Sequence, residues 1–309
     1  MRTKALIICL AVLASLPVSC TKDRLPEEGR RVEVRFNTGG TKSNDPASED
    51  AVNDVNLFVF NSISGLIESH IYMDKKALGK EPLAMDLLTN ISYDVAACIN
   101  FGYRVPDVRT INELPDFRFY LVYPDDYSTG MPMSAIYKGF VPGKQEGPLV
   151  MEAGRMMAKI GLTIDRSALN PDVSMFVEEA EIGNCPKSMT PFADSKPDSK
   201  SDIFTKGFFK KGIPVDVLNS NDGNGKSGEV SLYMLESLDS GLKPYIQLRL
   251  NYVSSASSSG NGKWLYYRFY IGPREGETNI KRNTRYHFTV FPHGTGIEGA
   301  PSWKVEFTD

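Results

Sequence analysis

DVNLFVFN, at residues 54–61, gives the clearest indication of the fold class of this 309-residue sequence. Apolar residues fill consecutive positions near its end, which is typical of a central strand that is covered on both faces. The run breaks at residues 62–65 (SISG) and apolar residues resume over 66–72. This pattern predicts a β-hairpin at the centre of a sheet.

The same period of two continues on both sides of this hairpin. Val32, Val34 and Phe36 alternate with Glu33 and Arg35, so the sequence predicts a half-buried strand with three apolar side chains on one face. Further strands are expected over residues 91–99, 117–123, 156–164, 230–236, 245–252, 263–271, 284–291 and 303–307. Only residues 107–114 look helical. The prediction is therefore an all-β protein, a sandwich or a barrel.

Glycine and proline cluster over residues 143–154, around one short apolar stretch. Such a cluster is typical of a domain boundary. We therefore expect an N-terminal β-sandwich over residues 32–150 and a C-terminal β-sandwich over residues 151–309, each of ordinary domain size.

The first twenty residues have the composition of an export signal. Arg2 and Lys4 precede an apolar run over residues 5–16, which is too short to span a bilayer. Ser19 comes directly before Cys20, and a small residue before a cysteine predicts a lipoprotein signal peptide over residues 1–20 with Cys20 as the lipidated residue. Residues 21–31 then form a flexible tether. The alternative is an ordinary secretory signal that is cut near Ser19.

Charge and cysteine content restrict the partners and the redox chemistry. The formal net charge is −3, and acidic and basic residues are interspersed. This argues against binding of nucleic acid and against electrostatic attachment to membranes. Outside the leader and Cys20, the cysteines are Cys98 and Cys185. They could form a disulfide in an oxidising compartment, or they could be two buried free thiols.

The sequence contains no recognisable catalytic or metal-binding pattern. His70, His287 and His293 are scattered, and neither Cys nor His occurs at metal-ligand spacing. No Gly-x-Ser-x-Gly elbow is present. Residues 220–227 (SNDGNGKS) end like a phosphate-binding loop, but they lack its first glycine and precede a predicted strand, so a polar hairpin loop fits better than a phosphate or calcium site. We therefore expect no enzymatic activity, no metal and no cofactor.

Several segments of the chain occur in an order and spacing that a known family shares. They are residues 55–61 (VNLFVFN) with Gly65, 93–100 (YDVAACIN), 154–160 (GRMMAKI), 232–236 (LYMLE), 270–272 (YIG), 279–280 (NI) and 282–286 (RNTRY). Together with the lipoprotein leader, this set resembles the fimbrillin-associated anchor and minor-subunit lipoproteins of type V pili. The chain departs from the family at Ser237, where the family prefers Asn.

The resemblance implies two consecutive transthyretin-like β-sandwich domains on a lipid anchor in the outer membrane, exposed outside the cell. It implies no catalytic site, and its expected partners are other fimbrial subunits. These join when a strand of one chain fills a groove in the next, a form of β-strand addition. Val32, Val34 and Phe36 then form the candidate exchangeable strand. For residues 282–286 we favour a structural role, with Asn283 in a tight turn and Tyr286 at the start of a core strand.

The role within a fimbria stays open at this point. One hypothesis is an anchor or minor subunit that keeps its first strand. Another is a shaft or tip subunit, in which proteolysis after an arginine removes that strand. Arg30 and Arg31 precede the predicted strand, so a cut there would free the lipid and leave the strand in place, which favours the anchor.

A third hypothesis is a surface glycan-binding lipoprotein. Trp264, Tyr266 and Tyr267 could form a stacking platform for sugar rings. Because these residues lie in a predicted strand of alternating pattern, packing in the core is the favoured interpretation.

Overall fold

The computed structural model describes residues 28–38, 49–127, 129–197, 200–206, 209, 212–239, 241–256, 262–296 and 303–308. The predicted signal peptide, Cys20 and most of the predicted tether lie outside these residues. Strands dominate the described chain, which confirms the all-β prediction. The helices are short and comprise α1 (Lys75–Leu78), η1 (Ile111–Asp116), η2 (Lys200–Asp202) and α2 (Val215–Asn219). None of the helices in the described part of the chain has the length and hydropathy needed to cross a membrane.

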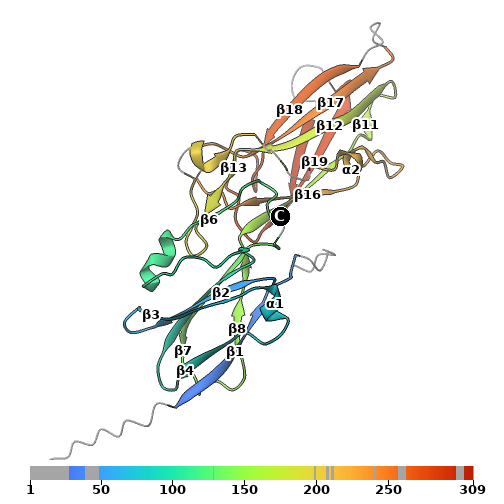
Figure 1. Ribbon diagram of the computed structural model, residues 1–309. Coiled ribbons are helices and arrows are strands. Elements are labelled where there is room, and N and C mark those ends of the chain that lie inside the picture. Colours follow the sequence, from blue (N-terminus) through green and yellow to red (C-terminus); the bar gives the residue numbers. More distant parts are fainter. Residues whose placement is uncertain are drawn as a thin grey trace, which may run out of the picture.

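The N-terminal half, residues 28–155, contains two sheets that face each other (Figure 1). The first sheet has the order β4 (Ala84–Leu88), β1 (Gly29–Asn37), β8 (Leu149–Glu152). The second has the order β3 (Ile67–Met73), β2 (Val55–Asn61), β5 (Tyr93–Ile99), β7 (Met133–Phe140), β9 (Gly154–Arg155). The predicted hairpin of residues 54–72 is therefore confirmed as β2 and β3, and β2 is a central strand.

Apolar side chains from both sheets form the N-terminal core between them. Val32 and Val34 of β1 and Met85 of β4 belong to this core, together with Leu57 and Val59 of β2. The alternation that the sequence shows in β1 directs Val32 and Val34 inward. Burial of such side chains contributes about 1.5–3 kcal/mol each, so the first strand is part of what holds this half together.

The C-terminal half, residues 157–308, also has two facing sheets (Figure 1). One has the order β11 (Ala168–Leu169), β19 (Arg285–Gly294), β10 (Met157–Ile164), β16 (Val230–Leu235), and β20 (Trp303–Thr308) pairs with β19. The other has the order β12 (Val173–Gly183), β17 (Tyr245–Ser254), β18 (Lys263–Tyr270). The strands β10 and β19 run parallel to each other.

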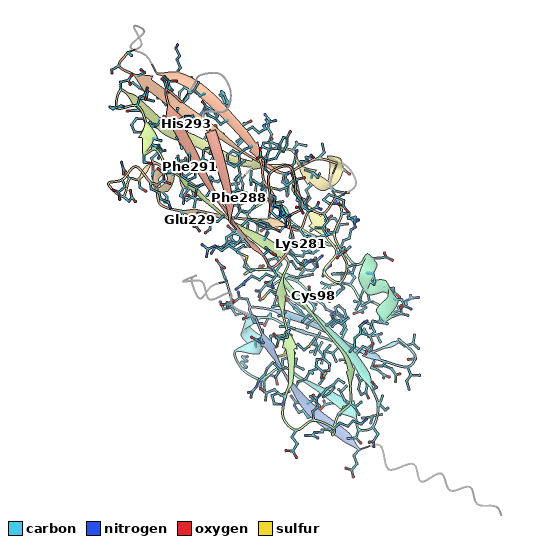
Figure 2. All side chains as sticks on the ribbon, turned by 180° about the vertical axis from the view of Figure 1, so that it is seen from behind. Cys98, Glu229, Lys281, Phe288, Phe291 and His293 are labelled. Atoms are coloured by element: carbon cyan, nitrogen blue, oxygen red, sulfur yellow. The ribbon has the colours of Figure 1, made fainter. Side chains whose placement is uncertain are left out.

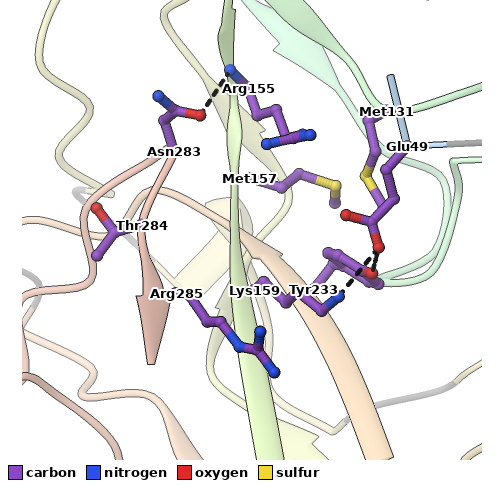
Figure 3. A pocket seen from close by; sticks show the side chains of 9 residues that line it. All are labelled: Glu49, Met131, Arg155, Met157, Lys159, Tyr233, Asn283, Thr284 and Arg285. Carbon is purple, nitrogen blue, oxygen red and sulfur yellow. Dashed lines mark hydrogen bonds and ion pairs between the residues drawn. The ribbon is translucent and has the colours of Figure 1, made fainter. Parts of the chain in front are cut away.

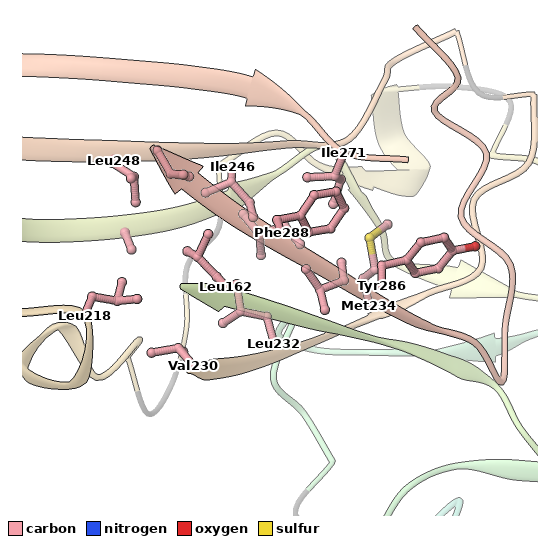
Figure 4. Packing of buried hydrophobic residues seen from close by; sticks show 14 of the residues in the cluster. Leu162, Leu218, Val230, Leu232, Met234, Ile246, Leu248, Ile271, Tyr286 and Phe288 are labelled. Carbon is pink, nitrogen blue, oxygen red and sulfur yellow. The ribbon is translucent and has the colours of Figure 1, made fainter. Parts of the chain in front are cut away.

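A second core lies between the two C-terminal sheets (Figure 4). Leu162 and Phe288 contribute to it from one sheet, and Ile246 and Leu248 from the other. Leu218 of the short helix α2 packs at one end of this cluster. Phe288 lies in this half, whereas Cys98 lies in the N-terminal half (Figure 2).

A third apolar cluster, here called the joint cluster, unites the two halves. Phe58 and Phe60 lie on the face of β2 that points away from the N-terminal core, and they share this cluster with Met157, Met189 and Leu235 of the C-terminal half. Next to it, β6 (Phe119–Tyr120) pairs antiparallel with β14 (Ser188–Met189), so a two-stranded sheet also crosses between the halves. A small sheet of β13 (Cys185–Pro186) and β15 (Ile203–Phe204) follows in the chain.

Several elements differ from the sequence-based expectations. The long strand β12 was not predicted, because a β-bulge between Val177 and Glu179 shifts the register and interrupts the alternation. Of the strand expected over residues 117–123, only β6 forms. The expected helix over 107–114 is the 3₁₀ turn η1, and the short helix α1, capped by the Asp74 carboxylate that accepts from the Ala77 N–H at 2.8 Å, was missed.

Candidate assembly site

The strand β1 is held between two neighbouring strands, β4 and β8. Residues Gly29–Glu33 pair antiparallel with β4, and residues Val34–Asn37 pair parallel with β8. Among the strands that the structure describes, neither β4 nor β8 pairs with any strand except β1. Without β1, the three-stranded sheet would therefore lose all of its strand-to-strand hydrogen bonds.

The inner face of β1 closes one side of the N-terminal core. Val32 is 4% exposed and Val34 is 5% exposed, and Phe36 packs against the same core while remaining half-buried. The structure thus brings together on one face the three residues that the sequence singled out. Leu149 and Met151 of β8, also buried in this core, are the neighbours that the sequence analysis did not find. Because β8 has only four residues, its period of two was too short to identify it.

The outer face of β1 is polar. The Arg35 guanidinium donates from Nε to the Glu33 carboxylate at 2.9 Å, and both side chains are exposed to solvent. This carboxylate raises the pKa of Arg35. If β1 left its place, the groove would therefore bind a strand that has apolar residues at every second position. The residues between them would face solvent and have little effect on binding.

The strand begins earlier than the sequence analysis expected. It starts at Gly29, so the last three residues of the predicted tether belong to the sheet. Arg30 pairs with Leu87 and Arg31 pairs with Asp86 in the ladder with β4. The two arginines therefore lie within the first strand and not before it. The sequence pattern does not indicate this earlier start, because Gly29, Arg30 and Arg31 are all exposed and none of them adds an apolar residue to the inner face.

A polar cluster fixes the joint between the halves (Figure 3). The Lys159 ammonium lies 3.2 Å from the Glu49 carboxylate, which also accepts a hydrogen bond from the Tyr233 hydroxyl. Arg155 pairs with Asp50. Glu49, Lys159, Tyr233 and Arg155 line a cavity of about 20 Å³ together with Asn283, and this cavity has room for about one water molecule. The cavity is too small for a substrate, so this cluster is a structural joint.

Residues 282–286 have the structural role that the sequence analysis favoured. Asn283 adopts a left-handed conformation with φ of 54°, and Tyr286 is buried in the C-terminal core. Arg282 has a larger role than expected, because its guanidinium donates to the buried Glu236 carboxylate and to the carbonyls of Pro191 and Ala193. No spacing rule in the sequence could have identified these partners.

The aromatic residues of β18 do not all pack in the core. Trp264 is 53% exposed and Tyr266 is 63% exposed, so the favoured interpretation of core packing was wrong for both. Tyr267 faces inward, and its hydroxyl donates to the Gly296 carbonyl at 2.6 Å. The alternation separates the two faces of β18 but does not say which one is covered: the odd-numbered residues pack against the core, and the even-numbered residues lie on the outer face of the sheet.

Among the residues that the structure describes, the histidines and cysteines do not gather at one site. His293 lies in the C-terminal half, far from Cys98 (Figure 2). Cys98 and Cys185 are buried free thiols, and burial raises the pKa of each. Over the described residues, no three side chains of the metal-binding types lie close together.

The loop at residues 220–227 uses its polar oxygens internally. The Asp222 carboxylate accepts from the N–H groups of Asn224 and Lys226, and these bonds lower the pKa of Asp222. The Asn221 side-chain oxygen accepts from the N–H groups of Gly223 and Gly225. The prediction of a polar loop fits these contacts, but the predicted hairpin is wrong, because the loop joins α2 to β16 and not one strand to the next.

Comparison with known proteins gives a consistent answer at the level of the fold. No protein-family model matches the sequence, and no curated protein matches it. A solved structure from Bacteroides eggerthii, of a protein whose proposed role is cell adhesion, is 15% identical, with a TM-score of 0.59 over 92% of this chain and 96% of that chain. A tip fimbrial protein from Porphyromonas gingivalis, solved with a C-terminal truncation, is 13% identical, with a TM-score of 0.57 over 92% of this chain and 99% of that chain.

A fimbrilin from Porphyromonas gingivalis is 12% identical, with a TM-score of 0.55 over 90% of this chain and 95% of that chain. The shared fold covers nearly the whole length of each of these proteins. The resemblance to a fimbrillin-like family is therefore confirmed for the fold.

Proposed function

We propose that this chain, which has the fold of bacterial fimbrial proteins, is a structural subunit of a cell-surface fimbria that joins other subunits by β-strand addition. The observation that carries the proposal is the position of β1. It is the only described partner of both β4 and β8, and it covers the N-terminal core with Val32, Val34 and Phe36. A sheet that depends on one terminal strand is suited to exchange that strand with another chain.

Within such a fimbria, we assign the chain the role of an anchor or minor subunit in the outer membrane, held by a lipid on Cys20. The start of β1 at Gly29 supports this assignment, because Arg30 and Arg31 are paired in the sheet. A protease needs an extended substrate that is free of such pairing, so the folded protein would resist a cut at these arginines. An anchor retains its first strand, whereas a shaft or tip subunit exchanges it.

The proposal includes two tandem transthyretin-like β-sandwiches and no enzymatic activity. We place the boundary between them near residue 156 and not at residue 150, because Met151 and Ala153 are buried in the N-terminal core and β9 pairs with β7. The separate N-terminal and C-terminal cores support the two sandwiches. The joint cavity of about 20 Å³ and the buried thiols support a structural protein.

Strand removal tests the assembly mechanism. A chain that begins at residue 38 should be less stable than the parent, and a peptide with the sequence of β1 (GRRVEVRFN) should restore its stability. A peptide with Glu33→Lys and Arg35→Glu, which changes only the exposed face, should restore it equally well. A peptide with Val32→Asp and Val34→Asp should not, since two carboxylates would enter an apolar core.

Thermal unfolding with each peptide, followed by mixing with purified fimbrial subunits, provides the readout. If the truncated chain is as stable as the parent and binds neither the peptide nor a subunit, strand addition is wrong for this protein.

The lipid anchor is tested separately. Cys20→Ala should release the protein from outer-membrane fractions and leave its thermal unfolding unchanged, because buried acyl chains contribute about 0.8 kcal/mol per CH₂ to membrane binding. The N-terminus of the protein from intact cells then distinguishes the roles. An acylated Cys20 supports the anchor, and an N-terminus beyond Phe36 supports a polymerising subunit.

A further inference from the structure

A cavity of about 290 Å³ opens in the C-terminal half, between β11, the start of β12 and the loop after α2. Figure 1 shows these elements in the part of the molecule that lies away from β1. The cavity is therefore separate from the candidate assembly site, and a ligand could bind there whether or not the chain serves in a fimbria. Its volume is at the lower end of the range for small-molecule sites, about 300–1,000 Å³, so it suits a small ligand.

Arg166 supplies the positive charge in the lining of this cavity. Its Nε donates to the Met175 carbonyl at 3.0 Å, and its Nη2 lies 3.4 Å from the Asn219 side-chain oxygen. None of the carboxylates in the described residues forms an ion pair with it, and burial lowers the pKa of Arg166. A guanidinium has five N–H donors, so these two contacts leave most of them available. A partly buried positive charge that lacks a counter-charge favours the binding of an anion.

The groups that hold Arg166 are themselves fixed. The Asn219 side chain accepts from the Val177 N–H at 2.8 Å and donates to the Val177 carbonyl at 2.7 Å. The backbone N–H of Arg166 donates to the Gly225 carbonyl at 2.9 Å. Gly225 has φ of +95°, and a Cβ there would lie 2.7 Å from the backbone nitrogen of Ser167, so only glycine allows this close approach. The guanidinium is thus held in position before any ligand arrives, which reduces the entropic cost of binding.

The remaining lining is uncharged and combines polar groups, aliphatic side chains and one aromatic ring. Asn170 and Ser174 line the cavity, and their side chains form no hydrogen bond with the other described residues. Phe176, also in the lining, is 52% exposed although it lies in a strand. Amide and hydroxyl groups match the hydroxyls of a sugar, and an exposed aromatic ring matches the apolar face of a sugar ring.

We propose that this cavity binds an acidic monosaccharide unit, such as a uronic acid, whose carboxylate is held by Arg166. Asn170 and Ser174 then bind its hydroxyl groups, and Phe176 packs against its ring. One guanidinium with neutral neighbours matches the single charge of a carboxylate and can bind both of its oxygens.

Titration of the purified full chain with galacturonate, glucuronate and N-acetylneuraminate tests the proposal. Galactose is the neutral counterpart, and acetate and inorganic phosphate are the free anions. Calorimetry or NMR should show that at least one acidic sugar binds about 10-fold or more tightly than galactose, because hydrogen bonds to the charged group are lost in the neutral sugar. Acetate and phosphate should bind more weakly than that sugar, since neither fills the cavity.

Three variants locate the site. Arg166→Met should weaken binding of the acidic sugar by about 10- to 100-fold. Ser174→Trp fills the cavity from an exposed position, keeps Arg166 and should abolish binding even if Arg166→Met fails to fold. Tyr270→Ala is the matched control, because Tyr270 is 54% exposed on the same face of the same sheet but lies outside the cavity lining. It should leave the affinity unchanged.

The proposal is overturned if no acidic sugar binds, if galactose binds as tightly, or if acetate or phosphate binds as tightly as the acidic sugars. It is equally overturned if Ser174→Trp leaves the binding intact.

Discussion

Glu236 and Arg282 form a shielded ion pair in which the carboxylate and the guanidinium lie 2.5 Å apart. The same carboxylate accepts from the Ser195 N–H at 3.1 Å, while Arg282 donates to the carbonyls of Pro191 and Ala193. The pair therefore attaches the segment around residues 191–195 to the end of β16 and to the turn before β19. Both residues lie in segments on which the family resemblance rests.

Arg282→Met should lower the free energy of unfolding by about 3–5 kcal/mol, because it leaves the buried Glu236 carboxylate without a positive charge to pair with. Urea unfolding followed by tryptophan fluorescence measures the change. Lys196→Met is the matched control, since Lys196 pairs with Asp239 at 2.8 Å and both side chains are largely exposed. That variant should leave the urea midpoint unchanged. Equal effects of the two substitutions would contradict the structural role of Arg282.

Val34→Ala should destabilise the chain by about 1.5–3 kcal/mol, since Val34 is buried where β1 changes its partner from β4 to β8. Arg35→Ala, one residue further along, changes only the exposed face and should leave the unfolding midpoint unchanged. Chemical denaturation compares the two. A larger effect for Arg35 than for Val34 would show that the faces of β1 are assigned wrongly.

The stability of the protein should fall as the pH is lowered below about 6.5, the ordinary pKa of histidine. Burial lowers the pKa of His70, which stacks on Phe58 and contacts the Asp107 carboxylate at 2.7 Å. Because its pKa is lower in the folded state, the unfolded chain binds the proton more readily, so stability is lost as the pH drops from the unfolded pKa toward the folded one.

His70→Gln should reduce the change of stability with pH between about pH 6.5 and the lower pKa that His70 has in the folded protein. Thermal unfolding across that pH range measures the change. The prediction is wrong if the parent protein becomes more stable as the pH is lowered through that range and if His70→Gln abolishes this gain in stability.

Leu235→Ala should destabilise both halves together by about 2–5 kcal/mol, because Leu235 is buried in the joint cluster that the halves share. Hydrogen exchange would then accelerate in β5 of the N-terminal half as well as in β17 of the C-terminal half. Ile246→Ala, in the C-terminal core, is the comparison and should accelerate exchange mainly in β17. If Leu235→Ala affects one half only, the two halves unfold independently.

The sequence predicted the elements whose burial follows a simple period. The alternation of Val32, Val34 and Phe36 identified both the strand and its inner face, and the apolar run of residues 55–61 identified a central strand. Where the period is interrupted, prediction failed. The bulge between Val177 and Glu179 interrupts the alternation of β12, so this strand was not predicted. Residues at the start of β12 line the cavity around Arg166.

Long-range contacts were beyond prediction for a different reason. Trp264 and Tyr266 have the pattern of any half-buried strand, and nothing local shows which face of β18 packs on the core and which is open. Arg166 likewise has no signal of its own, because its partners Met175 and Asn219 are brought to it by the fold. The lipid on Cys20 and the exchange of β1 remain predictions.

The dependence of β4 and β8 on β1 also has a consequence for the order of folding. Asn37 of β1 and its partner Glu152 of β8 are 115 residues apart in the chain, so the last residues of the strand, Val34–Asn37, cannot pair until most of this half has been synthesised. Closing so long a loop costs entropy before any pairing offsets it, and topologies with such distant contacts fold slowly. We therefore expect the docking of β1 to be the slow step of folding, during which the newly synthesised chain still has an open core.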